Sequence, residues 1–125
     1  MPDFQYLNKN ESLFNSIAVL DKATMGIRDQ QCLKRDEVGN CLLCFENGGA
    51  RFVLVGTVLM DMEEHFPQKG RLIVYEVRDD KLQLRHNESV NGSVQAMAFV
   101  DGETERYLVV GVNDEVLLFR LTRKD

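Results

Sequence analysis

Residues 51–77, RFVLVGTVLMDMEEHFPQKGRLIVYEV, and residues 106–121, RYLVVGVNDEVLLFRL, contain the same two apolar segments in the same order. RFVLVG aligns with RYLVVG, which begins 55 residues later, and LIVYEV aligns with VLLFRL. The copies differ in the connection between the two segments. A charged, proline-containing insertion at residues 58–70 stands where the second copy has only a short turn. The chain therefore carries an internal repeat with a period near 50 residues, which is the size of one β-propeller blade.

Short apolar segments separated by turn residues recur along the rest of the chain, and no window of about a dozen residues has a helical period. Several of these segments are apolar almost continuously, so both faces of the corresponding strands should be covered. A β-propeller meets this requirement, because each blade packs between two neighbouring blades. The sequence predicts strands at residues 15–20, 27–33, 41–46, 52–59, 72–77, 82–90, 94–100, 107–112 and 115–121.

These strands predict an all-β fold of about two consecutive four-stranded antiparallel blades. Residues 40–90 make one complete blade, residues 93–121 supply three strands of the next, and residues 14–33 supply about two strands of the one before. Closed propellers need roughly 4 to 8 blades, so residues 13–125 predict an incomplete ring. The chain is then a piece of a longer product, a subunit whose ring another chain completes, or an open stack of sheets. Unpaired blade edges would favour self-association, and residues 1–12 are expected to form a flexible N-terminal arm.

Composition narrows the classes of function. A formal net charge of −5 argues against a protein that binds nucleic acid through its phosphates, so any nucleic acid is expected to be held by a partner. With 44% hydrophobic and 28% charged residues, the chain should fold rather than stay disordered. The N-terminal 30 residues contain no long apolar stretch, which predicts neither a signal peptide nor a membrane span. Three cysteines, an odd number, fit free thiols in a reducing compartment.

Candidate catalytic groups are few. Cys41 and Cys44 have the CxxC spacing, but on a strand they point to opposite faces and cannot chelate one ion together. His65 beside Glu63 and Glu64 suggests a metal or acid–base site, although solvated loop charges explain the same residues. We expect no cofactor, no metal and no catalytic residue. A small metal-dependent or thiol enzyme is the alternative from another class, and metal content and thiol reactivity would reveal it.

Three short motifs occur in order: FVLVGT at residues 52–57, PQKGR at residues 67–71 and VNGSV at residues 90–94. With the acidic pair before PQKGR and the closing VNDEVLLFRL, they resemble the family of the damaged-DNA-binding large subunit and the cleavage and polyadenylation specificity factor A subunit. The resemblance is to the third β-propeller segment of that family. It runs over roughly residues 15–121 and is strongest at residues 52–94.

The resemblance implies a non-catalytic protein-interaction scaffold in the nucleus, with the cytoplasm as the alternative location. The damaged-DNA-binding member of the family is an adaptor of a cullin-RING ubiquitin ligase in DNA repair, and its third propeller belongs to a cleft that grips substrate-receptor proteins. The alternative within the family is a subunit of a pre-mRNA processing complex of the polyadenylation or splicing factor 3b type. Residues after VGT help line the receptor pocket in the family, and they carry over here to Val58, Met60, Glu64, His65 and Phe66.

The residues of this loop support the same expectation more weakly. Apolar Met60, Met62 and Phe66 alternate with acidic side chains, and flexible methionines beside an aromatic ring suit an adaptable binding surface. The same apolar side chains would also serve to pack the loop onto the edge of the blade. Insertions in surface loops cost little stability, so both interpretations stay open at this point.

Overall fold

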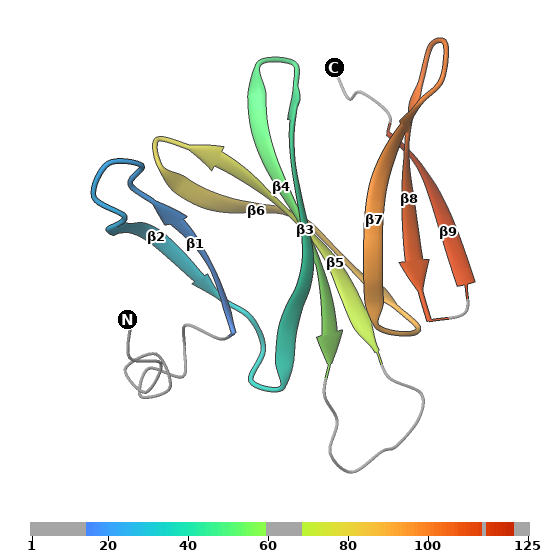
Figure 1. The fold of residues 1–125 in the computed structure, drawn as a ribbon, viewed down its shortest axis with the longest axis horizontal. Coiled ribbons are helices and arrows are strands. Elements are labelled where there is room, and N and C mark those ends of the chain that lie inside the picture. Colours follow the sequence, from blue (N-terminus) through green and yellow to red (C-terminus); the bar gives the residue numbers. More distant parts are fainter. Residues whose placement is uncertain (1–14, 60–68, 114, 122–125) are drawn as a thin grey trace.

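The computed structural model describes residues 15–59, 69–113 and 115–121, and within these ranges all regular structure is β (Figure 1). Three antiparallel sheets follow one another along the chain, with two, four and three strands. No helix in the described ranges is long and apolar enough to cross a membrane. The prediction of an all-β fold built from incomplete propeller blades is confirmed. The predicted arm at residues 1–12 lies outside the described residues.

The strands pair in sequence order within each sheet. The four-stranded sheet lies in the middle, with the two-stranded sheet on one side and the three-stranded sheet on the other (Figure 1). The first sheet contains β1 (Ser16–Leu20) and β2 (Ile27–Cys32), the second contains β3 (Glu37–Asn47), β4 (Ala50–Leu59), β5 (Gly70–Arg78) and β6 (Lys81–Val90), and the third contains β7 (Val94–Asp101), β8 (Arg106–Val112) and β9 (Glu115–Leu121).

Two apolar layers separate the three sheets. Between the first two sheets, Val55 and Ile73 are each 1% exposed and lie in one cluster of buried residues. Between the second and third sheets, Leu54 and Leu72 belong to a separate cluster that includes Val94 of β7. Neighbouring residues of β4 and β5 thus enter opposite layers. This explains why their sequences are apolar almost without interruption.

β3 is longer than the sequence predicted. Expected at residues 41–46, it begins at Glu37, and its first residues pair with the far end of β4 as Glu37 with Leu59 and Val38 with Val58. The apolar pattern did not reveal this extension, because Glu37, Gly39 and Asn40 resemble a polar turn. Pairing with β4 outweighs that local preference. The extension brings β3 beside the start of the insertion.

Gly56 and Gly111 occupy matching positions in the repeat, and each lies opposite a bulge. The register shifts between Gly39 and Cys41 in one pair of strands and between Val94 and Ala96 in the other. A Cβ on Gly56 would lie 2.3 Å from Val94 Cγ1, so the close approach of β7 requires glycine there. A Cβ on Gly111 would have Ala96 O, at 3.9 Å, as its nearest neighbour. The repeat thus preserves the bulge and the glycine, but only the first copy has a side chain packed on that glycine.

The connections fall at two opposite edges of the sheets. β4 ends and β5 begins at the same edge as the β2–β3 and β6–β7 connections, at the bottom of Figure 1. The β3–β4 and β5–β6 hairpins turn at the other edge through residues with positive φ, namely Gly48 at 61° and Gly49 at 83°, and Asp79 at 54° and Asp80 at 61°. Two successive residues with positive φ are typical of tight type I′ hairpins. The ends of β4 and β5 that flank residues 60–68 therefore lie at the edge where the sheets are joined to one another.

Candidate functional site

The base of the insertion is a short antiparallel bridge. Leu59 N–H donates a hydrogen bond to Lys69 O at 2.7 Å, and the two residues form an isolated bridge between the ends of β4 and β5. Val58, one of the predicted site residues, is half-buried on β4 directly before this bridge. The other predicted residues lie outside the described residues, and these are Met60, Glu64, His65 and Phe66. The structure therefore places the base of the predicted site.

A buried polar network lies directly beneath this bridge. Arg71 of β5 donates to the Glu37 carboxylate through both Nε, at 2.6 Å to Oε2, and Nη2. Thr57 of β4 donates its hydroxyl to Glu37 Oε2 at 2.7 Å and accepts the Arg71 backbone N–H at 3.0 Å. Three neighbouring strands thus each contribute one polar side chain to the same cluster. We call Glu37, Thr57 and Arg71 the buried network.

The buried network is almost sealed from water. Glu37 and Thr57 are 0% exposed and Arg71 is 9% exposed. Burial by itself would raise the pKa of Glu37, but hydrogen bonds from Arg71 and Thr57 more than offset it, so this pKa lies below its usual value. The hydrogen bonds to Glu37 in turn raise the pKa of Arg71. The two side chains therefore form a charged, bidentate pair in the interior.

The same carboxylate also reaches the connection between the first two sheets. Lys34 N–H donates to Glu37 Oε1 at 3.0 Å, while Glu37 N–H donates to Lys34 O at 3.0 Å. Asn15 adds side-chain hydrogen bonds to the carbonyl oxygens of Arg35, at 2.8 Å, and Glu37, at 3.2 Å. Glu37 therefore joins the β2–β3 connection to the base of the β4–β5 connection.

Glycines allow two further connections to meet at this edge. A Cβ on Gly70 would lie 2.4 Å from Thr57 O and 2.6 Å from Gly92 O, so no other residue fits there without movement of the backbone. Ser93, which follows Gly92, donates its hydroxyl to Asn113 Oδ1 of the β8–β9 turn at 3.1 Å. The motifs FVLVGT, PQKGR and VNGSV thus converge in space. Their residues hold together the ends of neighbouring sheets.

Sequence reasoning found Thr57 and Arg71 only as parts of motifs and did not find Glu37. Glu37 lies in a polar stretch with turn character, and a charged residue there ordinarily indicates solvent exposure. Its partner Arg71 is 34 residues away along the chain. The usable signal was the arginine directly before a continuous apolar strand, because an arginine at a buried strand start requires a carboxylate nearby.

The cysteines and histidine of the described part do not form a site together. Cys41 is half-buried and Cys44 is exposed, as expected for residues on opposite faces of β3. Burial raises the pKa of the Cys41 thiol, which lowers its reactivity. His86 lies 3.5 Å from Glu88 on the outer strand β6. Among the described residues, no group of three or more His, Cys, Asp or Glu side chains could hold a metal ion.

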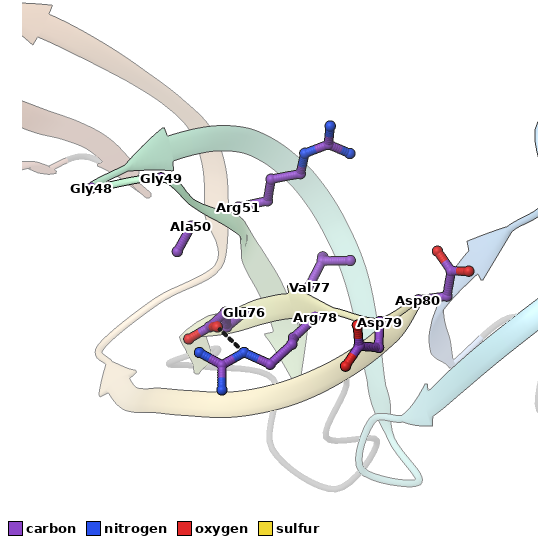
Figure 2. Close-up of a pocket in the computed structure, with 9 residues that line it drawn as sticks. All are labelled: Gly48, Gly49, Ala50, Arg51, Glu76, Val77, Arg78, Asp79 and Asp80. Atoms are coloured by element: carbon purple, nitrogen blue, oxygen red, sulfur yellow. Dashed lines mark ion pairs between the residues drawn. The ribbon is translucent and has the colours of Figure 1, made fainter.

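A concave surface lies at the opposite edge, between the two type I′ hairpins. This groove has a volume of about 500 Å³ and is lined by Gly48 to Arg51 on one side and by Glu76 to Asp80 on the other. Figure 2 draws these residues. Glu76 receives Arg78 Nε at 3.1 Å and Arg85 Nε at 3.0 Å, so its carboxylate is already paired. In Figure 2, Arg51 extends away from this pair. The groove is polar, and its charged centre is satisfied internally.

The family model of the CPSF A subunit region matches residues 14–125. The chain belongs to this family. DNA damage-binding protein 1a of Arabidopsis thaliana is 28% identical over 120 residues, which are 94% of this chain and 11% of that protein. DNA damage-binding protein 1 of Caenorhabditis elegans is 32% identical over 118 residues, covering 86% of this chain and 10% of the relative. The predicted family is confirmed, and the chain spans about a tenth of the length of these relatives.

Proposed function

We propose that this chain is a non-catalytic part of a protein-interaction scaffold and that its β4–β5 connection contacts the partner. The observation that carries the proposal is the connection itself. The long connection joins β4 and β5, whose adjoining ends are held by a buried charged network, whereas the matching β8–β9 hairpin has a short turn. Loops that extend from a rigid framework are the usual place for binding.

The proposed contact residues are Val58 and the segment at 60–68, which includes Met60, Glu64, His65 and Phe66. Methionine and phenylalanine supply adaptable apolar contact, and the acidic residues between them favour a partner with basic groups around an apolar patch. Following the family resemblance given above, the proposed partner is a substrate-receptor protein, and the proposed assembly is a ubiquitin ligase adaptor acting in DNA repair. The proposed location is the nucleus.

Charge supports a protein partner rather than direct contact with nucleic acid. The chain has 20 acidic and 15 basic residues, and an acidic surface repels phosphate. Nucleic acid would be held by other members of the assembly. We propose no catalytic role for the chain. Cys41 is the least exposed of its three cysteines, and burial makes this thiol less reactive by raising its pKa.

A second candidate within the same class is a pre-mRNA processing complex. The matching family is named after the CPSF A subunit, and this name favours the RNA-processing alternative as directly as the names of the relatives favour DNA repair.

Self-association is a further proposed property of the isolated chain. The last strand of the third sheet, β9, exposes 72% of Val116 and 65% of Leu118, and an apolar strand at a sheet edge is prone to pair with another chain.

Photo-crosslinking in nuclear extract tests the proposed contact. A photoreactive phenylalanine analogue replaces His65 in one variant and Leu84 in the control, because Leu84 is exposed on β6, far along the sheet from the insertion. The proposal expects a defined protein adduct at position 65 and none at position 84. The identity of that adduct separates a ubiquitin ligase receptor from an RNA-processing subunit. Equal labelling at both positions, or adducts with nucleic acid alone, would contradict the proposal.

Metal content and thiol labelling test the non-catalytic part of the proposal. The purified chain is expected to contain no stoichiometric metal ion, and its three cysteines should react with a maleimide at rates that follow their exposure. Cys41 is then the slowest of the three. A bound metal ion, or one cysteine that reacts far faster than an exposed thiol, would instead indicate an enzyme.

A further inference from the structure

The repeat shows where the buried network is placed and where it is missing. Residues 55 positions after Glu37 and Thr57 are Gly92 and Val112. Arg71 directly precedes Leu72, which pairs with Gly56. Glu115 likewise directly precedes Val116, which pairs with Gly111, so Glu115 matches Arg71. The second copy thus has a glycine, a valine and an exposed glutamate in place of the three polar residues. The network occurs in the copy that carries the insertion.

Stability alone does not account for this difference. Removing two charges from water costs as much as their attraction returns, and apolar residues of similar size are often as stable or more stable. The second copy demonstrates that the same strands close with Val112, which is 3% exposed. What a bidentate arginine–carboxylate pair adds is a fixed orientation, because two parallel hydrogen bonds resist rotation.

That orientation is imposed at the base of the insertion. Glu37 is the residue that pairs with Leu59 in the β3–β4 ladder, and Leu59 is bonded to Lys69. Arg71 follows Lys69 by two residues on β5 and is held through its side chain by Glu37 and through its backbone by Thr57. Both ends of the insertion are therefore connected to one rigid cluster.

We propose that Glu37, Thr57 and Arg71 are positioning residues, which hold the Leu59–Lys69 base in the orientation that the partner binds. The proposal rests on the proposed function of the β4–β5 connection. The residues touch no partner themselves and act by limiting the directions in which the connection leaves the blade. A binding segment that is held in its bound orientation loses less entropy on association. The Glu37 bond to Lys34 N–H extends this control to the connection from the preceding sheet.

A double substitution separates positioning from stability. Glu37→Met with Arg71→Met removes both buried charges and keeps side chains of similar length, so the chain should fold with an unfolding free energy close to that of the wild type. The matched control is Glu46→Met with Arg51→Met, which removes one acidic and one basic residue from β3 and β4 of the same sheet. That pair is 3.7 Å apart, with side chains 73% and 77% exposed. Both variants keep the net charge of −5.

The first measurement is amide hydrogen exchange at Leu59, whose N–H is bonded to Lys69 O. Loss of the network should accelerate this exchange by about tenfold relative to the control pair, because the base opens locally without global unfolding. A second variant, Thr57→Val, keeps the ion pair and removes only the hydroxyl, so it should produce a smaller acceleration. Unchanged exchange at Leu59 in the folded Met variant would overturn the proposal.

The second measurement is the affinity of the purified protein that crosslinks at position 65. The Glu37→Met with Arg71→Met variant should bind this protein about tenfold more weakly than the control variant does. The reason is that its insertion is no longer held in the bound orientation before association. Equal affinities would overturn the positioning role. Failure of the proposed function has a different signature: a chain in which Asn-Gly replaces residues 60–68 would then retain this protein at full affinity.

Discussion

The β4–β5 and β8–β9 hairpins start from matching strands and end differently. Both have a glycine opposite a bulge in the preceding strand, at Gly56 and at Gly111. The β8–β9 hairpin then turns at once and is fastened by Ser93 to Asn113, whereas the β4–β5 hairpin continues through an insertion above buried Glu37 and Arg71. The comparison teaches that the blade fold needs neither the insertion nor the buried charges. The insertion and the buried charges occur together, in the first copy.

The largest difference between the two hairpins should appear when one acidic side chain is neutralised. Glu37→Gln leaves Arg71 charged in the interior, and breaking a buried pair in this way costs about 3 to 5 kcal/mol. The control Glu115→Gln alters an exposed glutamate in the second copy, at the place that matches Arg71, and should change stability by less than about 0.5 kcal/mol. Urea denaturation of both variants measures the contrast. Similar costs would mean that Glu37 is not effectively buried.

A methyl group added to each repeat glycine gives the next largest contrast. Gly56→Ala places a Cβ 2.3 Å from Val94 Cγ1 and 2.8 Å from Cys41 Sγ, so the two sheets must separate, at a cost of about 1 to 3 kcal/mol. Gly111→Ala meets only Ala96 O at 3.9 Å and should be neutral within about 0.5 kcal/mol. Thermal unfolding compares the two variants. A destabilised Gly111→Ala would show that this position is also covered.

Acid should weaken the fold in part through the buried network. Because the pKa of Glu37 in the folded chain lies below its ordinary value of 4.5, the ionised carboxylate stabilises the fold above that value, and this contribution is lost as the pH falls through the lower pKa. The Glu37→Gln variant should therefore lose less stability than the wild type between neutral and strongly acidic pH. Urea titrations at a series of pH values test this. Parallel curves for the two proteins would contradict the direction of the shift.

The exposed side of the second hairpin should affect association and have little effect on stability. Leu118 is 65% exposed on β9, so Leu118→Lys should alter the unfolding free energy by no more than about 0.5 kcal/mol. It should also convert any self-associated wild-type chain to a monomer in light scattering, since a charge on an edge strand opposes strand pairing. Leu84→Lys on β6 is the control. A monomeric wild type would contradict self-association through β9.

Much of this architecture was predictable because apolar periodicity records which faces of a strand are covered. The continuous apolar residues of β4 and β5 required neighbours on both sides, and the structure provides them in two separate clusters. The repeat also aligned Gly56 with Gly111, and each of these glycines lies opposite a bulge. These features depend on burial, which leaves a regular trace in sequence.

The base of the candidate site was not predictable in the same way. Glu37 lies in a polar, turn-like stretch, and its burial depends on Thr57 and Arg71, which are distant in the chain. A buried charge has no period, and only its partner distinguishes it from a surface residue. The early start of β3 was missed for the same reason. The predicted contacts at Met60, Glu64, His65 and Phe66 lie outside the described residues and stay predictions.

Replacing residues 60–68 with Asn-Gly tests the central claim most directly. This dipeptide favours the type I′ turn that would close the hairpin directly above the Leu59–Lys69 bridge. The account predicts a folded chain whose unfolding free energy is within about 1 kcal/mol of the wild type, and which no longer binds the protein that crosslinks at position 65. A folded variant that binds this protein with wild-type affinity would contradict the claim that the insertion serves partner binding.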